Sequence, residues 1–96
     1  MAKIIWTEEA YRWLKDIHDY ISSDNPKAAF QTVSGIYQKI RVLKRFPEVG
    51  YIHRHADAVR ILLFGHYRIA YKLDREKNVV ILGIFHAALD ISRYLV

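Results

Sequence analysis

Apolar positions recur with two different periods along the chain, and the period distinguishes helical from extended parts. In residues 10–21 and again in residues 29–43, apolar side chains return every three or four positions, which predicts two amphipathic helices. Residues 22–26 break this pattern. Thr7 can cap the first helix, Asn25 can cap the second, and Pro26 fits the first turn of the second. The two helices should therefore form an antiparallel hairpin joined by a tight turn.

A later part of the chain is predicted to form a three-strand antiparallel meander. Residues 59–64, 67–73 and 79–85 are rich in branched and aromatic side chains. Only Gly65 and His66 separate the first two segments, which suits a type II′ turn because glycine adopts a positive φ without strain. This turn pairs Phe64 with Tyr67, Leu62 with Ile69, and Arg60 with Tyr71.

This register assigns the hairpin side chains to two faces. The first face is strongly apolar and should meet the helices; it holds Leu62, Phe64, Tyr67, Ile69, Tyr71 and Leu73, with Arg60 near its edge. The second face is thinner, and Arg68 and Lys72 project from it into an open groove. Residues 79–85 are apolar throughout except at Gly83, which is typical of a strand buried on both faces. We therefore expect the C-terminal segment, a partner, or both to cover the second face.

The order of these elements predicts the fold class. Residues 3–6 form a short apolar segment that suits an edge strand, and residues 87–96 suit a short terminal helix. Strand, helix, helix, three-strand meander and terminal helix together predict an α+β fold, with the helical hairpin packed on one face of an antiparallel sheet. With 96 residues, the chain should form one domain over residues 1–96.

Composition narrows the class of protein. Apolar residues make up 52% and charged residues 26%, as in globular domains. No apolar run approaches the roughly 20 residues that span a bilayer, and the first residues lack a signal-peptide core. We therefore expect a cytoplasmic protein. The chain has no cysteine, so thiolate and disulfide chemistry are excluded, and its net charge of +5 favours an anionic partner, either nucleic acid or an acidic protein segment.

Several short motifs occur in a characteristic order. Asp24-Asn25-Pro26 lies between the helices, residues 46–50 read Phe-Pro-Glu-Val-Gly, residues 65–71 read Gly-His-Tyr-Arg-Ile-Ala-Tyr, and Val80-Ile81-Leu82 leads to His86 and Asp90. In this order, and over almost the whole chain, the motifs resemble the RelE/ParE toxin superfamily. These proteins are the toxins of bacterial type II toxin–antitoxin, or plasmid stabilisation, systems.

The resemblance implies two alternative activities. ParE-like members poison DNA gyrase, whereas RelE-like members cut mRNA on the ribosome without a metal. Both are neutralised by a small antitoxin that wraps the toxin. The Asn-Pro turn and the Phe-Pro-x-x-Gly segment resemble the ParE side more closely. We therefore expect a gyrase inhibitor that forms a hetero-oligomer with its antitoxin and needs no cofactor. A ribosome-dependent endoribonuclease and a non-toxic, antitoxin-binding member are the alternatives.

RNA cleavage would require a cation on the scissile phosphate and a general acid or base. Arg68 matches the arginine of the family's Tyr-Arg strand motif, and Tyr94 falls where relatives have a C-terminal tyrosine. His86 is a further candidate acid or base, although it can instead hydrogen-bond Asp90 and fix the last helix. After His86 the chain reads Ala87-Ala88-Leu89, where many relatives have one or two arginines. This departure favours a binding surface over a nuclease site.

The antitoxin or the target is expected on the second face. The predicted contacts on this face are Arg68, Lys72, Val80, Leu82 and Ile84. Arg60, at the edge of the first face, and Arg93, near the C-terminus, are further predicted contacts. Two other groups have ordinary structural explanations. Trp6, Trp13, Phe30 and Tyr37 suit core packing. Lys39, Arg41, Lys44 and Arg45 suit a helix C-terminus, where they could also bind an anion. His53, His55 and His66 lack the cysteines or carboxylates of a metal site, so no metal is expected.

Overall fold

In the computed structural model, which describes residues 2–54 and 58–87, both helices begin at the predicted caps. Oγ1 of Thr7 accepts a hydrogen bond of 3.1 Å from the Ala10 amide and caps α1 (Glu8–Ser22). Oδ1 of Asn25 accepts one of 3.1 Å from the Ala28 amide and caps α2 (Pro26–Arg41). A single 3₁₀ turn, η1 (Val42–Lys44), follows. Each cap gives a partner to an amide that has none inside the helix, so both predicted helix starts are confirmed.

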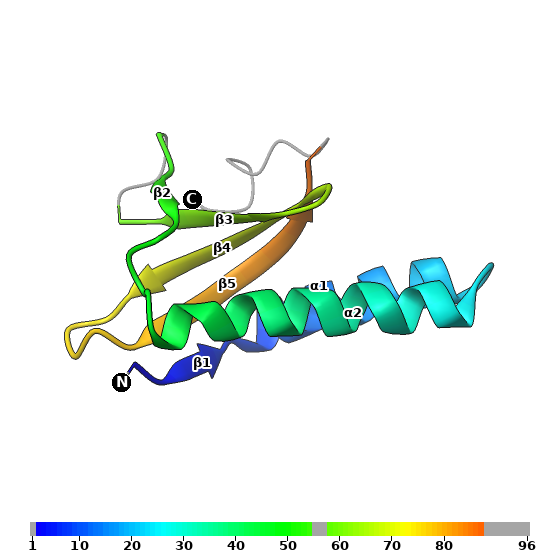
Figure 1. The fold of residues 1–96 in the computed structure, drawn as a ribbon, viewed down its shortest axis with the longest axis horizontal. Helices are drawn as coiled ribbons and strands as arrows, with labels where there is room; N and C mark the ends of the chain where they lie inside the picture. Colours follow the sequence, from blue (N-terminus) through cyan, green and yellow to red (C-terminus); the bar gives the residue numbers. More distant parts are fainter. Residues whose placement is uncertain (1, 55–57, 88–96) are drawn as a thin grey trace.

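Five strands form one sheet in the order β1-β5-β4-β3-β2 (Figure 1). They are β1 (Ile4–Trp6), β2 (Tyr51–Ile52), β3 (Arg60–Phe64), β4 (Tyr67–Leu73) and β5 (Val79–His86). The edge position of β1 and the antiparallel meander of β3, β4 and β5 are confirmed. The short strand β2, which pairs with β3, is not among the elements that the sequence predicts.

The sheet is mixed rather than antiparallel, because β1 runs parallel to β5. The antiparallel helices return the chain to the end of the sheet at which β1 begins, so β3 starts from that end (Figure 1). The two turns of the meander then leave β5 running in the direction of β1. The α+β class is therefore confirmed, and the helical hairpin acts as a crossover between parallel strands, which the prediction of an all-antiparallel sheet did not include.

The hairpin between β3 and β4 has the predicted register. Phe64 lies opposite Tyr67 and Leu62 lies opposite Ile69. Gly65 has a φ of 55°, and His66 is not among the residues with positive φ. A positive φ at the first turn position alone distinguishes type II′ from type I′, in which both positions are positive.

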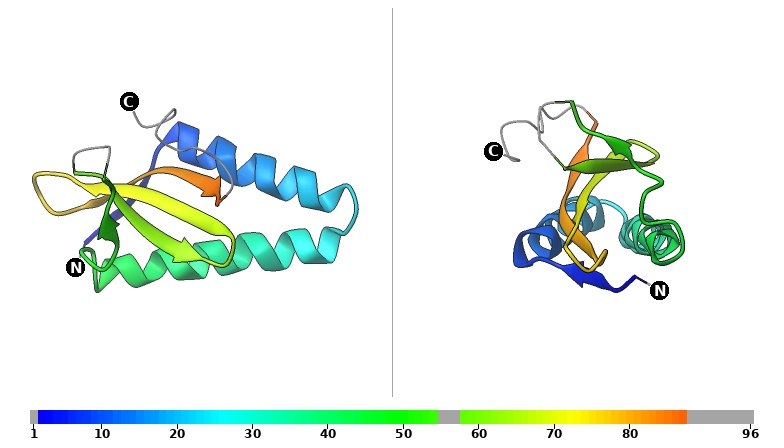
Figure 2. Two further views of the ribbon diagram at one scale, coloured as in Figure 1. Left: turned by 90° about the horizontal axis from the view of Figure 1, so that it is seen from above. Right: turned by 90° about the vertical axis from the view of Figure 1, so that its left-hand side faces the viewer.

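The helices lie side by side along the sheet (Figure 2), and the core forms between them and the predicted apolar face. Ile36 and Ile40 of α2 are buried against Ile69 and Tyr71 of β4. Two aromatic residues predicted for this core lie outside it, since Phe30 is 70% exposed and Tyr37 is 51% exposed. Each follows a buried residue by one position, which turns its side chain about 100° around the helix and away from the sheet. Neither helix is long and apolar enough to cross a membrane.

Candidate functional site

A β-bulge in β5 determines which of its side chains face the helices. Tyr71 pairs with Ile81, but the preceding Ala70 pairs with Gly83, so Leu82 has no partner on β4. An extra residue reverses the inward and outward alternation of the strand beyond it. Residues with even numbers thus change faces between the two halves of β5.

The bulge corrects the predicted binding face. Val80, Leu82 and Ile84 were expected to share the second face, but Ile84 is fully buried in the core beneath the helices. Val80 and Leu82 lie before and within the bulge and remain partly buried on the other side. The prediction that Ile84 is open to a partner is therefore wrong.

The face opposite the helices, called the second face below, has a buried centre and an exposed rim. Its described residues are Ile5, Tyr51, Ile61, Leu63, Arg68, Ala70, Lys72, Val80, Leu82, Gly83 and Phe85. The side chains of Ile61, Ala70 and Phe85 are buried. The predicted open groove is therefore wrong for the centre of this face.

Part of the burial of Phe85 comes from α1, which lies along the edge of β5. Thr7 follows β1 and bonds to the Ile81 carbonyl through both its hydroxyl, at 2.7 Å, and its amide, at 3.3 Å. Beyond that point α1 replaces β1 beside β5. The Trp13 ring meets the Phe85 ring edge-on, with centroids 4.7 Å apart. A partner would therefore reach the rim of the second face, where Leu63 is 55% and Tyr51 is 50% exposed.

Arg68 and Lys72 both lie on the second face, as predicted, but they differ in setting. Lys72 is exposed beside Val80. Arg68 is partly buried, and its Nη2 donates a hydrogen bond of 3.1 Å to the Ala87 carbonyl. This bond holds the chain where it leaves β5. Arg68 thus has a structural contact that sequence reasoning did not anticipate.

His86 lies at the end of β5, close to two other rings. The His66 ring stacks at a centroid distance of 6.1 Å, and the Tyr67 ring meets it edge-on at 5.8 Å. A hollow of about 560 Å³ opens beside it, lined mainly by Trp13, Ile17, Tyr20 and Tyr67. His86 is therefore an exposed ring in an aromatic setting. Its predicted contact with Asp90, and the candidates Arg93 and Tyr94, lie outside the described residues.

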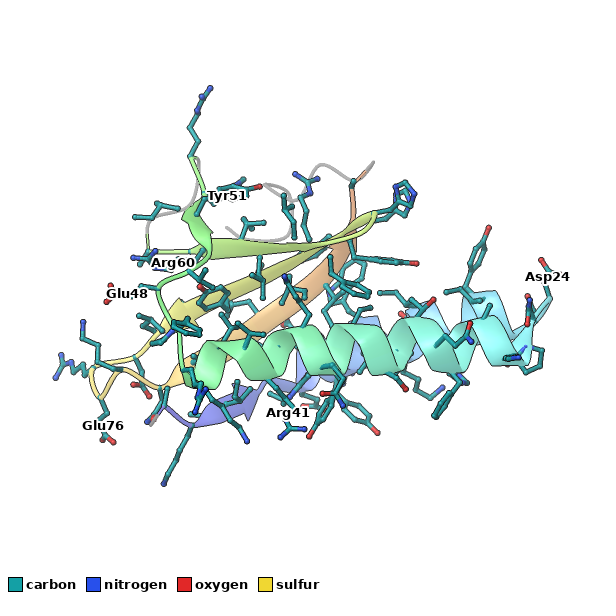
Figure 3. The ribbon with its side chains drawn as sticks, in the orientation of Figure 1. Asp24, Arg41, Glu48, Tyr51, Arg60 and Glu76 are labelled. Atoms are coloured by element: carbon teal, nitrogen blue, oxygen red, sulfur yellow. The ribbon has the colours of Figure 1, made fainter. Side chains whose placement is uncertain are left out.

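Arg60 points toward the chain that connects the helices to the sheet (Figure 3). Its Nη1 donates hydrogen bonds of 3.0 Å to the Glu48 carbonyl and 2.9 Å to the Gly50 carbonyl. The guanidinium predicted to bind a partner thus holds the end of the Phe-Pro-Glu-Val-Gly segment. A metal site is not formed by the described residues, since no three histidine, aspartate or glutamate side chains gather within 2–54 and 58–87.

Residues 4–91 match the family model described as the ParE toxin of type II toxin–antitoxin systems, parDE. A curated relative from Sinorhizobium fredii, named "Putative toxin Y4kP", is 34% identical over 86 residues, which cover 88% of each chain.

Two solved structures have similar folds. A chain of the chromosomal ParDE system from P. aeruginosa has a TM-score of 0.79 at 22% identity, covering 90% of this chain and 96% of that one. A chain of the RelBE2 toxin–antitoxin complex from Mycobacterium tuberculosis has a TM-score of 0.62 at 26% identity, covering 88% of this chain and 96% of that one.

Proposed function

Because the chain belongs to the ParE toxin family of type II toxin–antitoxin systems, we propose that it inhibits DNA gyrase by binding and is neutralised by a cognate antitoxin. The observation that carries this proposal is the match to a ParE toxin model from Ile4 to Ile91, which includes every described strand. The solved ParDE and RelBE2 structures support an antitoxin partner for proteins of this fold.

The chemistry of the second face supports binding rather than RNA cleavage. Its described cations are Arg68 and Lys72, and Arg68 already bonds to the Ala87 carbonyl. The exposed rim is otherwise apolar, with Leu63, Tyr51 and Ile5 as its large side chains. Leu63 and Tyr51 lie toward one edge of the sheet and Ile5 lies on the other edge strand. Exposed apolar side chains with few charges are more typical of a protein interface than of a phosphate-cleaving site. Phosphate cleavage would instead need several converging cations and hydrogen-bond donors.

Cleavage of mRNA is the second candidate, and one arrangement favours it. Arg68 and His86 lie at the same end of the β4–β5 pair, because Arg68 bonds to the residue that follows His86. The two side chains lie on opposite faces, however, since Arg68 pairs with Phe85 on the second face and His86 pairs with Tyr67 on the helix side. An RNA strand would have to pass around the end of the strands to meet both the guanidinium and the imidazole. The RelE-like alternative therefore has a specific pair of residues to test.

Purified toxin should be assayed with purified gyrase for supercoiling and DNA cleavage, and with translating ribosomes for mRNA cleavage. We expect inhibition of supercoiling. The paired change Leu63→Glu with Lys72→Glu should weaken this inhibition at least about tenfold, which corresponds to a loss of about 1.4 kcal/mol of binding free energy. Lys27→Glu, an exposed charge reversal at the far end of α2, should have no effect. Normal supercoiling and cleavage at saturating folded toxin would overturn the proposal, and cut mRNA that depends on Arg68 and His86 would favour the second candidate.

A further inference from the structure

A groove runs between β1 and the C-terminal half of α2, away from the second face. Its volume is about 510 Å³. One side is lined by Ile4 and Trp6 of β1 together with Lys3, which precedes the strand. The helix and its 3₁₀ turn line the other side with Tyr37, Arg41 and Lys44. These six residues define what we call the β1 groove. Figure 3 shows Arg41 projecting from α2 on the side where β1 lies.

One wall of the β1 groove is a strand edge with unused backbone groups. The Val79 amide donates to the Lys3 carbonyl at 2.8 Å, and the Thr7 amide donates to the Ile81 carbonyl at 3.3 Å. Alternate residues of a strand direct their amides and carbonyls to opposite edges. Lys3 and Thr7 therefore face β5, whereas the amides and carbonyls of Ile4 and Trp6 face outward. β1 ends the strand order of the described sheet, so no described strand pairs with this outer edge. Just before β1 the Ala2 amide donates to the Lys44 carbonyl at 3.4 Å, so the open part of the edge begins at Ile4.

The side chains of the β1 groove combine positive charge with apolar surface. Lys3, Arg41 and Lys44 supply three cations, and none of them forms an ion pair with a carboxylate in the described parts of the chain. Trp6 and the half-exposed Tyr37 supply aromatic surface between the cations. A partner that fits must therefore carry negative charge, present apolar side chains and satisfy a strand edge.

The geometry points to an extended, acidic peptide segment that binds in the β1 groove as an additional strand on β1. Its backbone would pair with the Ile4 and Trp6 groups, its carboxylates would meet Arg41 and Lys44, and its apolar side chains would cover Tyr37. Addition of a strand to a sheet edge gives affinity through the main chain and specificity through alternate side chains. The assignment of this segment to the antitoxin rests on the proposed function, whereas the peptide chemistry does not.

The backbone edge favours a peptide over single-stranded nucleic acid. Three cations with two aromatic rings would also suit a nucleic acid strand, whose bases stack on aromatic side chains. A nucleic acid, however, cannot match the amides and carbonyls of a strand edge, which β1 presents at Ile4 and Trp6. Nucleic acid is therefore the competing outcome of the test.

The test uses the full chain and a short synthetic peptide that alternates glutamate with valine. Amide NMR shifts and hydrogen exchange follow each backbone position during titration. We expect saturable binding with shifts centred on β1 and the end of α2, and slower exchange of the Ile4 and Trp6 amides. Arg41→Gln with Lys44→Gln should weaken binding at least about tenfold, whereas Lys27→Gln, which removes a charge at the other end of α2, should not. The same peptide with lysine in place of glutamate should not bind.

Three results would overturn the inference: no saturable binding, shifts centred on Lys72 and Leu63 instead, or displacement of the peptide by a single-stranded oligonucleotide at lower concentration. None of these measurements involves gyrase. If the peptide binds as expected but gyrase is unaffected by the toxin, the β1 groove stands and the proposed function fails. If gyrase is inhibited but the peptide does not bind, the proposed function stands and the β1 groove is not a peptide site.

Discussion

Arg60 and Tyr71 lie opposite each other on β3 and β4, and both bond to the short segment that follows η1. Arg60 donates to the carbonyls of Glu48 and Gly50. The Tyr71 hydroxyl donates to the Pro47 carbonyl at 2.8 Å and accepts from the Gly50 amide at 2.9 Å. Four hydrogen bonds thus fasten the connection between the helices and the sheet. The Phe-Pro-Glu-Val-Gly segment and the second tyrosine of the β4 motif form one structural unit.

Tyr71→Phe should destabilise the protein, because it leaves the buried Gly50 amide without an acceptor. The expected loss in the free energy of unfolding is about 1–3 kcal/mol. Urea unfolding followed by circular dichroism measures it. Tyr20→Phe, at an exposed position on α1, is the matched control and should change little. Equal stability of Tyr71→Phe and wild type would show that the hydroxyl does not hold the segment.

Stability should also fall at alkaline pH through Tyr71. Burial raises the pKa of Tyr71 above its ordinary value of 10.0, and the Gly50 hydrogen bond opposes this only in part. The protonated phenol is therefore favoured in the folded state, so its contribution is fully present below the ordinary pKa and is lost as pH rises through the raised one. The stability difference between wild type and Tyr71→Phe should shrink as pH rises beyond about 10. A difference that stays constant there would contradict this assignment.

Gly50→Ala and Gly65→Ala should differ in their cost for different physical reasons. A Cβ at Gly50 would lie 2.7 Å from the Tyr71 ring and 2.8 Å from the Ile61 carbonyl. We expect a loss of about 1–3 kcal/mol, as for other overpacked sites. A Cβ at Gly65 meets open space, and only its φ of 55° opposes the change, at a cost of about 1 kcal/mol. Thermal unfolding of both variants measures the two losses of stability. A larger loss for Gly65→Ala than for Gly50→Ala would contradict this prediction.

Because of the bulge at Leu82, substitutions at two neighbouring positions should destabilise the protein to different extents. Ile84→Ala should cost about 2–5 kcal/mol of stability, because it opens a cavity in the core. Val80→Ala should cost about 1 kcal/mol, since Val80 is only partly buried on the second face. Denaturant unfolding of the two variants measures both values. Similar losses at the two positions would mean that β5 alternates without a bulge.

The sequence was sufficient for elements that carry local signals. Thr7 and Asn25 are caps recognised from their residue types, and Gly65 marks a turn that sets the register of the hairpin. The bulge was missed because residues 79–85 are apolar throughout, and an extra residue changes no visible period in such a run. Consequently Ile84 was assigned to the wrong face.

Other features depend on contacts that the sequence does not display. Arg60 bonds to backbone carbonyls. Every residue has a carbonyl, so the sequence does not show which ones accept these bonds. The exposure of Phe30 and Tyr37 depends on how α2 is rotated against the sheet. The basic end of α2 was recognised as a possible anion site, but only the parallel pairing of β1 brings a strand edge beside it.

Inhibition of gyrase by binding can be tested by inducing the gene alone and measuring plasmid supercoiling and mRNA integrity in the same cells. We expect a growth block with loss of negative supercoiling and intact transcripts. Cleaved transcripts with normal supercoiling would contradict it and indicate a ribonuclease. Normal growth with soluble toxin present and both readouts unchanged would also contradict it, and would indicate a non-toxic partner of the antitoxin.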